Sequence, residues 1–134
     1  MTTWIELTEN PEALANLFEG APSLVDVEII NFEMDRHGPT ITLQVLLNSY
    51  PTSPPARWVM NRYNAIALRL QLLDVETVAL DGWSIENRLT LNIERQENKL
   101  SVFGRGRSMS FRLTCGWIRI DGATGYCRQV VANS

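Results

Sequence analysis

Apolar and polar side chains alternate along most of the chain after Pro22, and this period of two constrains the fold more than any other feature. Successive side chains of a β-strand point to opposite faces, so each alternating stretch predicts a strand with one buried face. Short turns separate the stretches, which predicts hairpins. We therefore expect a mostly-β (α+β) fold: an antiparallel β-sandwich or partly closed barrel of six to eight strands with one short N-terminal helix. The clearest alternating positions are Ile41, Leu43, Val45 and Leu47; Ile66, Leu68, Leu70 and Leu72; Leu89, Leu91 and Ile93; and Met109, Phe111, Leu113 and Cys115.

The first expected strand changes parity at Ile29-Ile30, which predicts a β-bulge or a strand buried on both faces. It should form a long hairpin with the second strand through the turn Asp35-Arg36-His37-Gly38. We expect a loop at 48–58, where three prolines occur, and another turn at Gly104–Arg107. The expected strands lie near residues 24–35, 40–47, 63–73, 75–80, 86–95, 100–103, 109–115 and 117–120.

A single helix is expected between Asn10 and Gly20. Asn10 is a favourable N-cap, and Pro11 suits the first helical position. An apolar face follows at helical spacing, and Gly20 fits a C-terminal stop. The residues of that face are Leu14, Leu17 and Phe18.

Charge is distributed unevenly along the chain. Residues 1–67 carry eight acidic and three basic side chains, a balance of −5, whereas residues 68–134 carry nine basic and seven acidic ones, a balance of +2. The acidic half is either a solvated surface or a face that attracts a basic protein partner. A net charge of −3 makes non-specific binding to nucleic acid or anionic lipid a poor fit. The candidate partner-binding residues are Glu9, Glu12, Glu19, Asp26, Glu28 and Asp35.

No set of residues predicts catalysis, a metal site or a cofactor site. His37, the one histidine, is expected to be an exposed turn residue, and neither Cys115 nor Cys127 belongs to a CxxC pair. Whether the two cysteines are paired is left open. No apolar run approaches the ~20 residues that span a bilayer, and the N-terminus lacks the pattern of a signal peptide, so we expect no membrane contact and a cytoplasmic location.

Four tryptophans are the heaviest side chains of the chain. In a β-domain, tryptophans are more often structural anchors than cofactor platforms, so we expect this role for Trp4, Trp58, Trp83 and Trp117. Pro54-Pro55 should hold the chain extended ahead of Trp58. The open alternative is a barrel whose interior holds a small ligand against tryptophan.

The order of these features resembles the immunity protein 50 family of bacterial polymorphic toxin systems. The resemblance implies a cytoplasmic protein that binds and neutralises a cognate toxin domain without catalysis. It supplies no binding residues. The residues that carry it are Trp4-Ile5, Leu17-Phe18, Pro22 to Glu28, Gly38-Pro39-Thr40, Leu43, Pro51, Pro54-Pro55, Trp58, Tyr63-Asn64, Asp74-Val75, Leu80, Gly82-Trp83 and Gly125-Tyr126.

With 134 residues, the chain is expected to form one domain, 1–134, large enough to fold around a core without disulfides or metals. Two other functions remain open: a small-ligand binding β-barrel module, and an enzyme whose residues meet only in the folded chain. The toxin, the surface that contacts it and the oligomeric state are also open.

Overall fold

The computed structural model describes residues 3–48, 50–51 and 54–127. Eight antiparallel strands form one sheet in the order β4-β7-β6-β5-β1-β2-β3-β8, and the sheet is not closed. The fold is therefore mostly β, as the alternating pattern predicts. The strands are β1 (Val27–Asp35), β2 (Thr40–Leu46), β3 (Ala65–Leu73), β4 (Thr77–Asp81), β5 (Arg88–Gln96), β6 (Lys99–Gly106), β7 (Ser110–Cys115) and β8 (Trp117–Tyr126).

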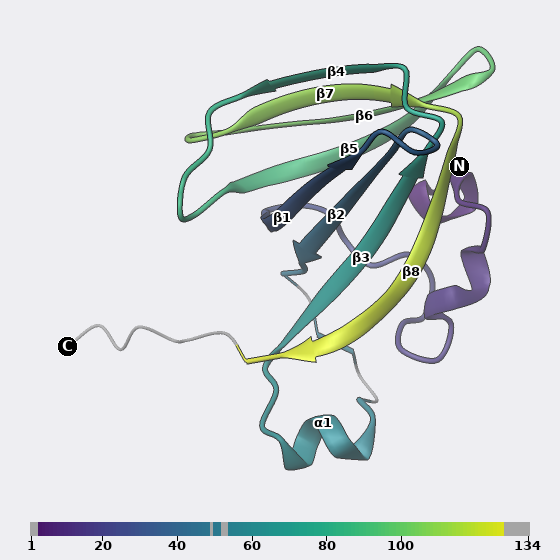
Figure 1. Ribbon diagram of the computed structural model, residues 1–134. Coiled ribbons are helices and arrows are strands. Elements are labelled where there is room, and N and C mark those ends of the chain that lie inside the picture. Colours follow the sequence, from purple (N-terminus) through teal and green to yellow (C-terminus); the bar gives the residue numbers. More distant parts are fainter. Residues whose placement is uncertain (1–2, 49, 52–53, 128–134) are drawn as a thin grey trace.

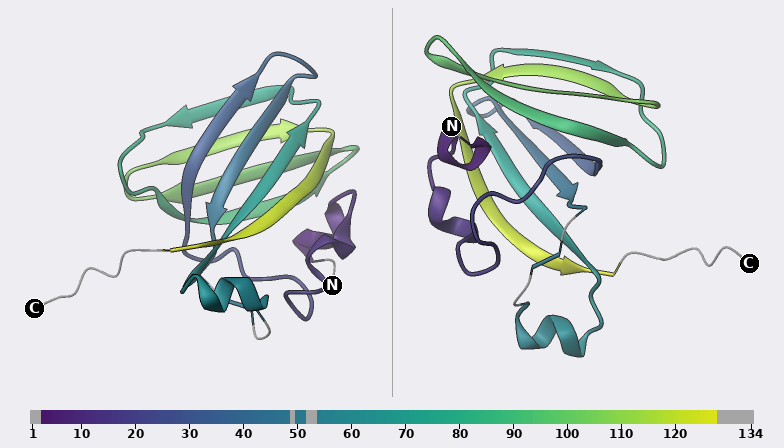
Figure 2. Two further views of the ribbon diagram at one scale, coloured as in Figure 1. Left: turned by 60° about the horizontal axis from the view of Figure 1, so that its bottom comes forward. Right: turned by 180° about the vertical axis from the view of Figure 1, so that it is seen from behind.

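The sheet bends over into two facing layers. β4, β7, β6 and β5 make one layer, and β1, β2, β3 and β8 cross it at an angle to make the other (Figure 1). Figure 2 shows the same two layers from below and from behind. The layers are joined through a short pairing of β1 with β5, at Val27 with Leu89 and Glu28 with Arg88. Apolar side chains from both layers meet between them in one cluster.

Strand alternation places these side chains. On β3, Ile66, Leu68, Leu70 and Leu72 are fully buried, whereas Arg69 and Gln71, which point to the other face, are partly exposed. Burial of a leucine or isoleucine side chain stabilises a fold by roughly 1.5–3 kcal/mol. The strands therefore hold the two layers together mainly through their inward residues.

The predicted first hairpin and its bulge are confirmed. β1 pairs with β2, and the register shifts between Ile29 and Asn31, where the parity changes in the sequence. Gly38 lies in the hairpin turn with a φ of +108°, which L-residues rarely adopt. The turn expected at Gly104–Arg107 was placed too early, because β6 continues to Gly106 and the glycines pair with β5 inside the sheet.

The helix expected at 10–20 is shorter and of another type. The N-terminal segment holds two 3₁₀-helices, η1 (Trp4–Leu7) and η2 (Pro11–Leu14). Asn10 makes no capping bond with its side chain. Its amide instead bonds to both backbone groups of Ile120 on β8, donating to the carbonyl and accepting from the N–H, each at 2.8 Å. This long-range contact replaces the local cap.

Residues around Trp58 form a short helix, α1 (Ala56–Met60), where an extended loop was expected. Pro55 is extended, with a ψ of 145°, but it is the residue at which the helix begins. The backbone N–H of Trp58 donates to the Pro55 carbonyl at 2.9 Å, and the Trp58 carbonyl accepts from Tyr63 at 3.0 Å. The helix turns the indole of Trp58 into the core, where the residue is 4% exposed.

The other three tryptophans are less buried than Trp58. Trp4 is half-buried, and its indole N–H donates to the Pro22 carbonyl at 2.8 Å. Trp83 and Trp117 are 52% and 57% exposed, so they do not anchor the core. Trp83 lies in the connection between β4 and β5, and Trp117 has the outward parity on β8, opposite to the buried Ile118.

The two edges of the open sheet differ. Beside the edge strand β8, the N–H of Glu9 donates to the Ile118 carbonyl at 2.8 Å, next to the bonds of Asn10. All five residues of the other edge strand, β4, are exposed. Edge strands carry unpaired backbone groups that favour further pairing. The N-terminal segment covers part of one such edge.

Candidate functional site

The six acidic residues proposed from the sequence do not form one surface. Glu9, Glu12 and Glu19 lie on the N-terminal segment, Asp26 and Glu28 lie at the start of β1, and Asp35 lies at its far end. Each group has a different electrostatic setting.

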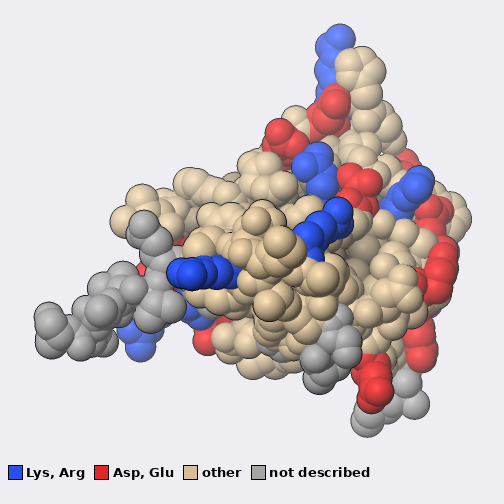
Figure 3. Space-filling model, turned by 90° about the horizontal axis from the view of Figure 1, so that it is seen from below, with Lys and Arg blue, Asp and Glu red and all other residues tan. Residues whose placement is uncertain are grey.

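The N-terminal segment carries four acidic side chains and no basic one between residues 3 and 20. Ile5 and Leu14 are buried beneath it, which fixes the segment beside β8 and leaves its carboxylates outward. The first basic side chain of the chain is Arg36, so residues 3–20 hold no compensating charge. Figure 3 shows acidic side chains along the side of the molecule on which this segment lies in Figure 1. We call this surface the acidic flank; it consists of the exposed residues Glu6, Glu9, Glu12 and Glu19.

Glu6 was not among the residues proposed from the sequence. The signal for it was present, because it belongs to the same stretch without Lys or Arg as the other three. It was passed over because the proposal kept to acidic residues on or next to the helix expected between Asn10 and Gly20.

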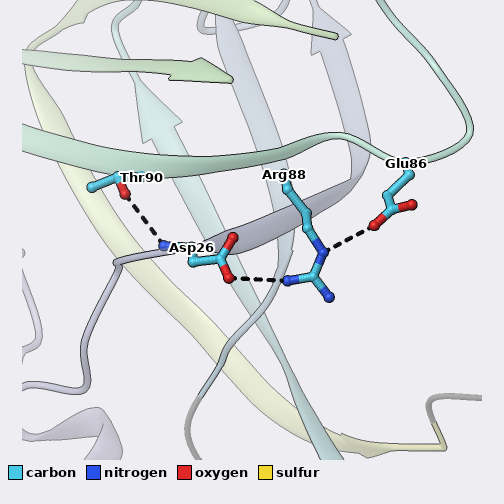
Figure 4. Close-up of polar contacts among 4 residues, drawn as sticks. All are labelled: Asp26, Glu86, Arg88 and Thr90. Carbon is cyan, nitrogen blue, oxygen red and sulfur yellow. Dashed lines mark hydrogen bonds and ion pairs between the residues drawn. The ribbon is translucent and has the colours of Figure 1, made fainter. Parts of the chain in front are cut away.

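Asp26 and Glu28 lie close to a basic side chain. Arg88 on β5 contacts Asp26 at 3.3 Å through Nη1 and Glu86 at 3.0 Å through Nε (Figure 4). The hydrogen bond to Glu86 is the main cause that raises the pKa of Arg88, and the charges of Asp26 and Glu28 add to it. The arginine therefore offsets part of the negative charge at the start of β1. We expect Asp26 and Glu28 to attract a basic partner less than the acidic flank does.

Asp35 is paired within its own turn. Its carboxylate accepts from the backbone N–H of His37 at 2.9 Å and contacts the ring Nδ1 at 3.0 Å. The backbone hydrogen bond, followed by the side-chain one, lowers the pKa of Asp35. The side chain of His37 is 83% exposed. The histidine and the carboxylate therefore form a solvated turn at the tip of the first hairpin.

Replacing His37 with alanine is expected to leave unchanged both the fold and the toxin neutralisation that the family resemblance implies. The side chains of His37 and Asp35 are both mostly exposed, and surface changes of this kind typically alter stability within about ±0.5 kcal/mol. Chemical denaturation and a toxin-protection assay measure the two properties. Loss of protection in a variant of unchanged stability would assign the ring a functional role.

The space between the two layers is filled with side chains. Leu43, Leu68, Leu70, Leu113 and Ile118 are at 0% exposure in its centre. Trp83 and Trp117 lie outside this space, which weakens the interpretation as a barrel that binds a ligand against tryptophan. A hollow of about 510 Å³ lies over β4 to β7 near Phe103 and Arg112. There the Arg112 guanidinium lies 4.5 Å from the centre of the Phe103 ring.

The two cysteines are free thiols in different environments. Cys115 is fully buried on β7, whereas Cys127 is exposed. Burial, with a smaller contribution from the Asp74 carboxylate, raises the pKa of Cys115 to about 12. The nucleophile is the thiolate, so Cys115 is expected to be inert at neutral and mildly alkaline pH.

Native protein should therefore react with a thiol reagent at pH 8 at one site, Cys127, and denatured protein at two. Counting thiols with a chromogenic disulfide reagent before and after adding denaturant tests this. The Cys127→Ser variant should show no fast reaction in the native state. Rapid modification of two thiols in native wild-type protein would contradict the burial of Cys115.

Comparison with known protein families relates the whole sheet to one family. A family model described as immunity protein 50 matches residues 10–126. The match runs from Asn10, whose side-chain amide bonds to β8, to the last residue of β8. The chain belongs to the immunity protein 50 family. The fold described above is thus that of an immunity protein, and immunity proteins are generally non-catalytic. No curated protein and no solved structure matches the chain in the same comparisons.

Among residues 3–48, 50–51 and 54–127, no three His, Cys, Asp or Glu side chains are placed to hold a metal ion. No helix of the described chain is long and apolar enough to cross a membrane. Charged and apolar patches distinguish the surface, and both kinds of patch occur in protein–protein interfaces.

Proposed function

We propose that this protein binds a cognate bacterial toxin domain directly and neutralises it by stoichiometric contact, without catalysis. Membership of the immunity protein 50 family over residues 10–126 carries this proposal. The structure adds a scaffold in which a buried core holds a charged surface in one geometry. A rigid surface suits a tight inhibitor, because little conformational entropy is lost on binding.

We further propose that the acidic flank is the surface that meets the toxin. Its four carboxylates are exposed on one short segment of the chain, and no Lys or Arg occurs within residues 3–20. An uncompensated charged surface attracts an oppositely charged partner over several ångströms and accelerates capture. A toxin with a basic active site, such as one that cleaves nucleic acid, fits this surface.

Co-expression with the toxin domain encoded beside this gene tests the function. Cells that produce the toxin should survive only when this protein is present, and the purified pair should form a stable complex with one molecule of each. The matched control is an unrelated toxin domain, which should neither bind nor be neutralised. Growth arrest in the presence of folded protein, with no complex detected, would refute the proposal.

Charge reversal tests the surface separately. The double variant Glu12→Lys/Glu19→Lys should lower the association rate roughly tenfold at low salt and change the dissociation rate less, because steering acts before contact. The effect should shrink as ionic strength rises, since the screening length is only about 8 Å at 0.15 M salt. Stopped-flow binding at several salt concentrations measures it.

Glu33→Lys/Glu94→Lys is the matched control. It changes the net charge by the same amount, but both residues are exposed on strands outside the acidic flank. Equal loss of association rate in the two double variants would show that total charge matters and that the flank does not. An unchanged rate in both would place the interface elsewhere.

A further inference from the structure

The outer edge of β4 is open to a further strand. β4 ends the strand order, and among the described residues β7 is the only strand that pairs with it. Its other side lies at the rim of its layer (Figure 1). Natural edge strands are often blunted by lysine, proline or a bulge. Thr77–Asp81 contains neither residue and pairs with β7 without a register shift, so the edge fits an added antiparallel strand.

The side chains of β4 divide by alternation into an apolar set and a more polar set. Val78 and Leu80 oppose the buried Leu113 and Phe111 of β7, so they lie on the core face of the sheet. They are nevertheless 36% and 44% exposed. A strand added beside β4 would cover them. The residues on the outer face are Thr77, Ala79 and Asp81.

A mostly apolar hollow of about 340 Å³ lies between the tip of the first hairpin and the start of β4. Val78 lines it from β4, and Met34, which is 65% exposed, lines it from β1. When a strand is added to a sheet, backbone hydrogen bonds give affinity and pockets for alternate side chains give specificity. The edge therefore favours a strand that places an apolar side chain opposite Val78.

The sequence of β4 meets this requirement itself. In an antiparallel pair of two copies centred on Ala79, all five residues of each β4 find a partner. The apolar set meets the apolar set on the core face, and no like charges oppose each other, which would destabilise the pair. The opposed residues are Val78 with Leu80, Ala79 with Ala79, and Thr77 with Asp81.

The outer face of this pair also has matching hydrogen-bond groups. The Thr77 hydroxyl lies 2.8 Å from that of Thr114, so it can accept from this neighbour and donate to the Asp81 carboxylate of the other copy. Centring the pair on Val78 would instead place Glu76 opposite Leu80. The side chains therefore favour the register centred on Ala79.

We infer that β4 is a self-association edge, at which two copies of the chain pair antiparallel about Ala79 and join their sheets. Two-fold contacts require one patch that is complementary to itself, and β4 is so in its backbone and in its side chains. Five residues from each copy are few beside the roughly 800 Å² per partner of a standard interface, so we expect a weak dimer. The acidic flank lies beside β8, at the other end of the strand order. The inference therefore goes beyond the proposed function and does not depend on it.

Sedimentation equilibrium of two lysine variants tests the register. Wild-type protein should form dimers at about 0.1–1 mM. Ala79→Lys should raise the dissociation constant at least ~2-fold, because the two ammonium groups oppose each other at the axis. Thr77→Lys is the matched control, with the same charge on the same face of the strand. It should lower the constant roughly 2- to 30-fold, because two ammonium–Asp81 pairs form. Thermal unfolding confirms that the variants are folded.

Disulfide trapping locates the axis. In a Cys127→Ser background, Ala79→Cys places two thiols opposite each other and should oxidise to a covalent dimer. Thr77→Cys is the control, because its two thiols would lie four residues apart along the pair, roughly 13 Å, too far for a disulfide. Cys115 is buried and should take no part.

Wild-type protein that is monomeric up to about 1 mM would overturn the inference. Equal effects of the two lysine variants, or equal oxidation of the two cysteine variants, would also overturn it. If the wild type is monomeric and Ala79→Lys loses toxin binding, the edge is a toxin contact instead. Dimerisation without toxin neutralisation would support the inference and refute the proposed function.

Discussion

Replacing Trp58 with alanine should destabilise the protein by ~3–5 kcal/mol, the usual cost of truncating a buried large aromatic side chain. Trp58 is 4% exposed and belongs to the core cluster. Its helix connects β2 to β3, and the indole is the buried side chain that attaches this helix to the core. Natural domains are stable by only about 5–15 kcal/mol, so the loss is a large part of the total.

Equilibrium denaturation in urea measures this difference. The matched control is Val59→Ala on the same helix, where the side chain is 61% exposed and the change should stay within about ±0.5 kcal/mol. A Trp58→Ala variant as stable as the wild type would show that α1 contributes little to the core. A large loss in Val59→Ala as well would instead indicate that the helix itself is fragile.

Gly82→Ala should lower the free energy of unfolding by about 2–5 kcal/mol, from two separate causes. Gly82 has a φ of +79°, which disfavours any L-residue. A β-carbon there would also lie 2.2 Å from the carbonyl oxygen of Ser108, a backbone atom that cannot move aside without shifting the chain before the buried Met109.

Gly20→Ala separates the two causes. Gly20 has nearly the same φ, +84°, but a β-carbon there would meet nothing within 4 Å. Gly20→Ala should lower the free energy of unfolding only by the conformational cost of about 1–2 kcal/mol. The difference between the two variants then measures the steric contact with Ser108. Equal losses would show that the chain near Ser108 relaxes freely.

The sequence predicted those parts of the fold that depend on neighbouring residues. The alternating runs indicated the strands, and the change of parity at Ile29-Ile30 indicated the bulge, because both signals lie within a few residues. The pairing of β1 with β5 joins residues about sixty positions apart through two pairs only, Val27 with Leu89 and Glu28 with Arg88. No local pattern specifies so short a junction, so the bending of the sheet into two layers remained one of two alternatives.

Local rules were wrong where a distant contact replaced them. Asparagine is a favoured residue at an N-cap, but the side-chain amide of Asn10 bonds to the backbone of Ile120 instead. Trp117 is large and apolar, but its parity on β8 directs it outward. The acidic flank, which we propose as the toxin-binding surface, was partly visible in the sequence as a run without Lys or Arg. The exposure of Ile85 was not visible, because it is a property of the folded chain.

The bond between Asn10 and Ile120 has a consequence for how the protein is made. It joins residues 110 positions apart, so the segment around Asn10 cannot make this contact until β8 has been synthesised and has folded. Contacts this distant in sequence are slow to form, because a long loop must close before they are made. A nascent chain therefore has its acidic carboxylates but not their arrangement. A chain in which β8 has not yet folded therefore lacks the arranged acidic flank that we propose as the toxin-binding surface.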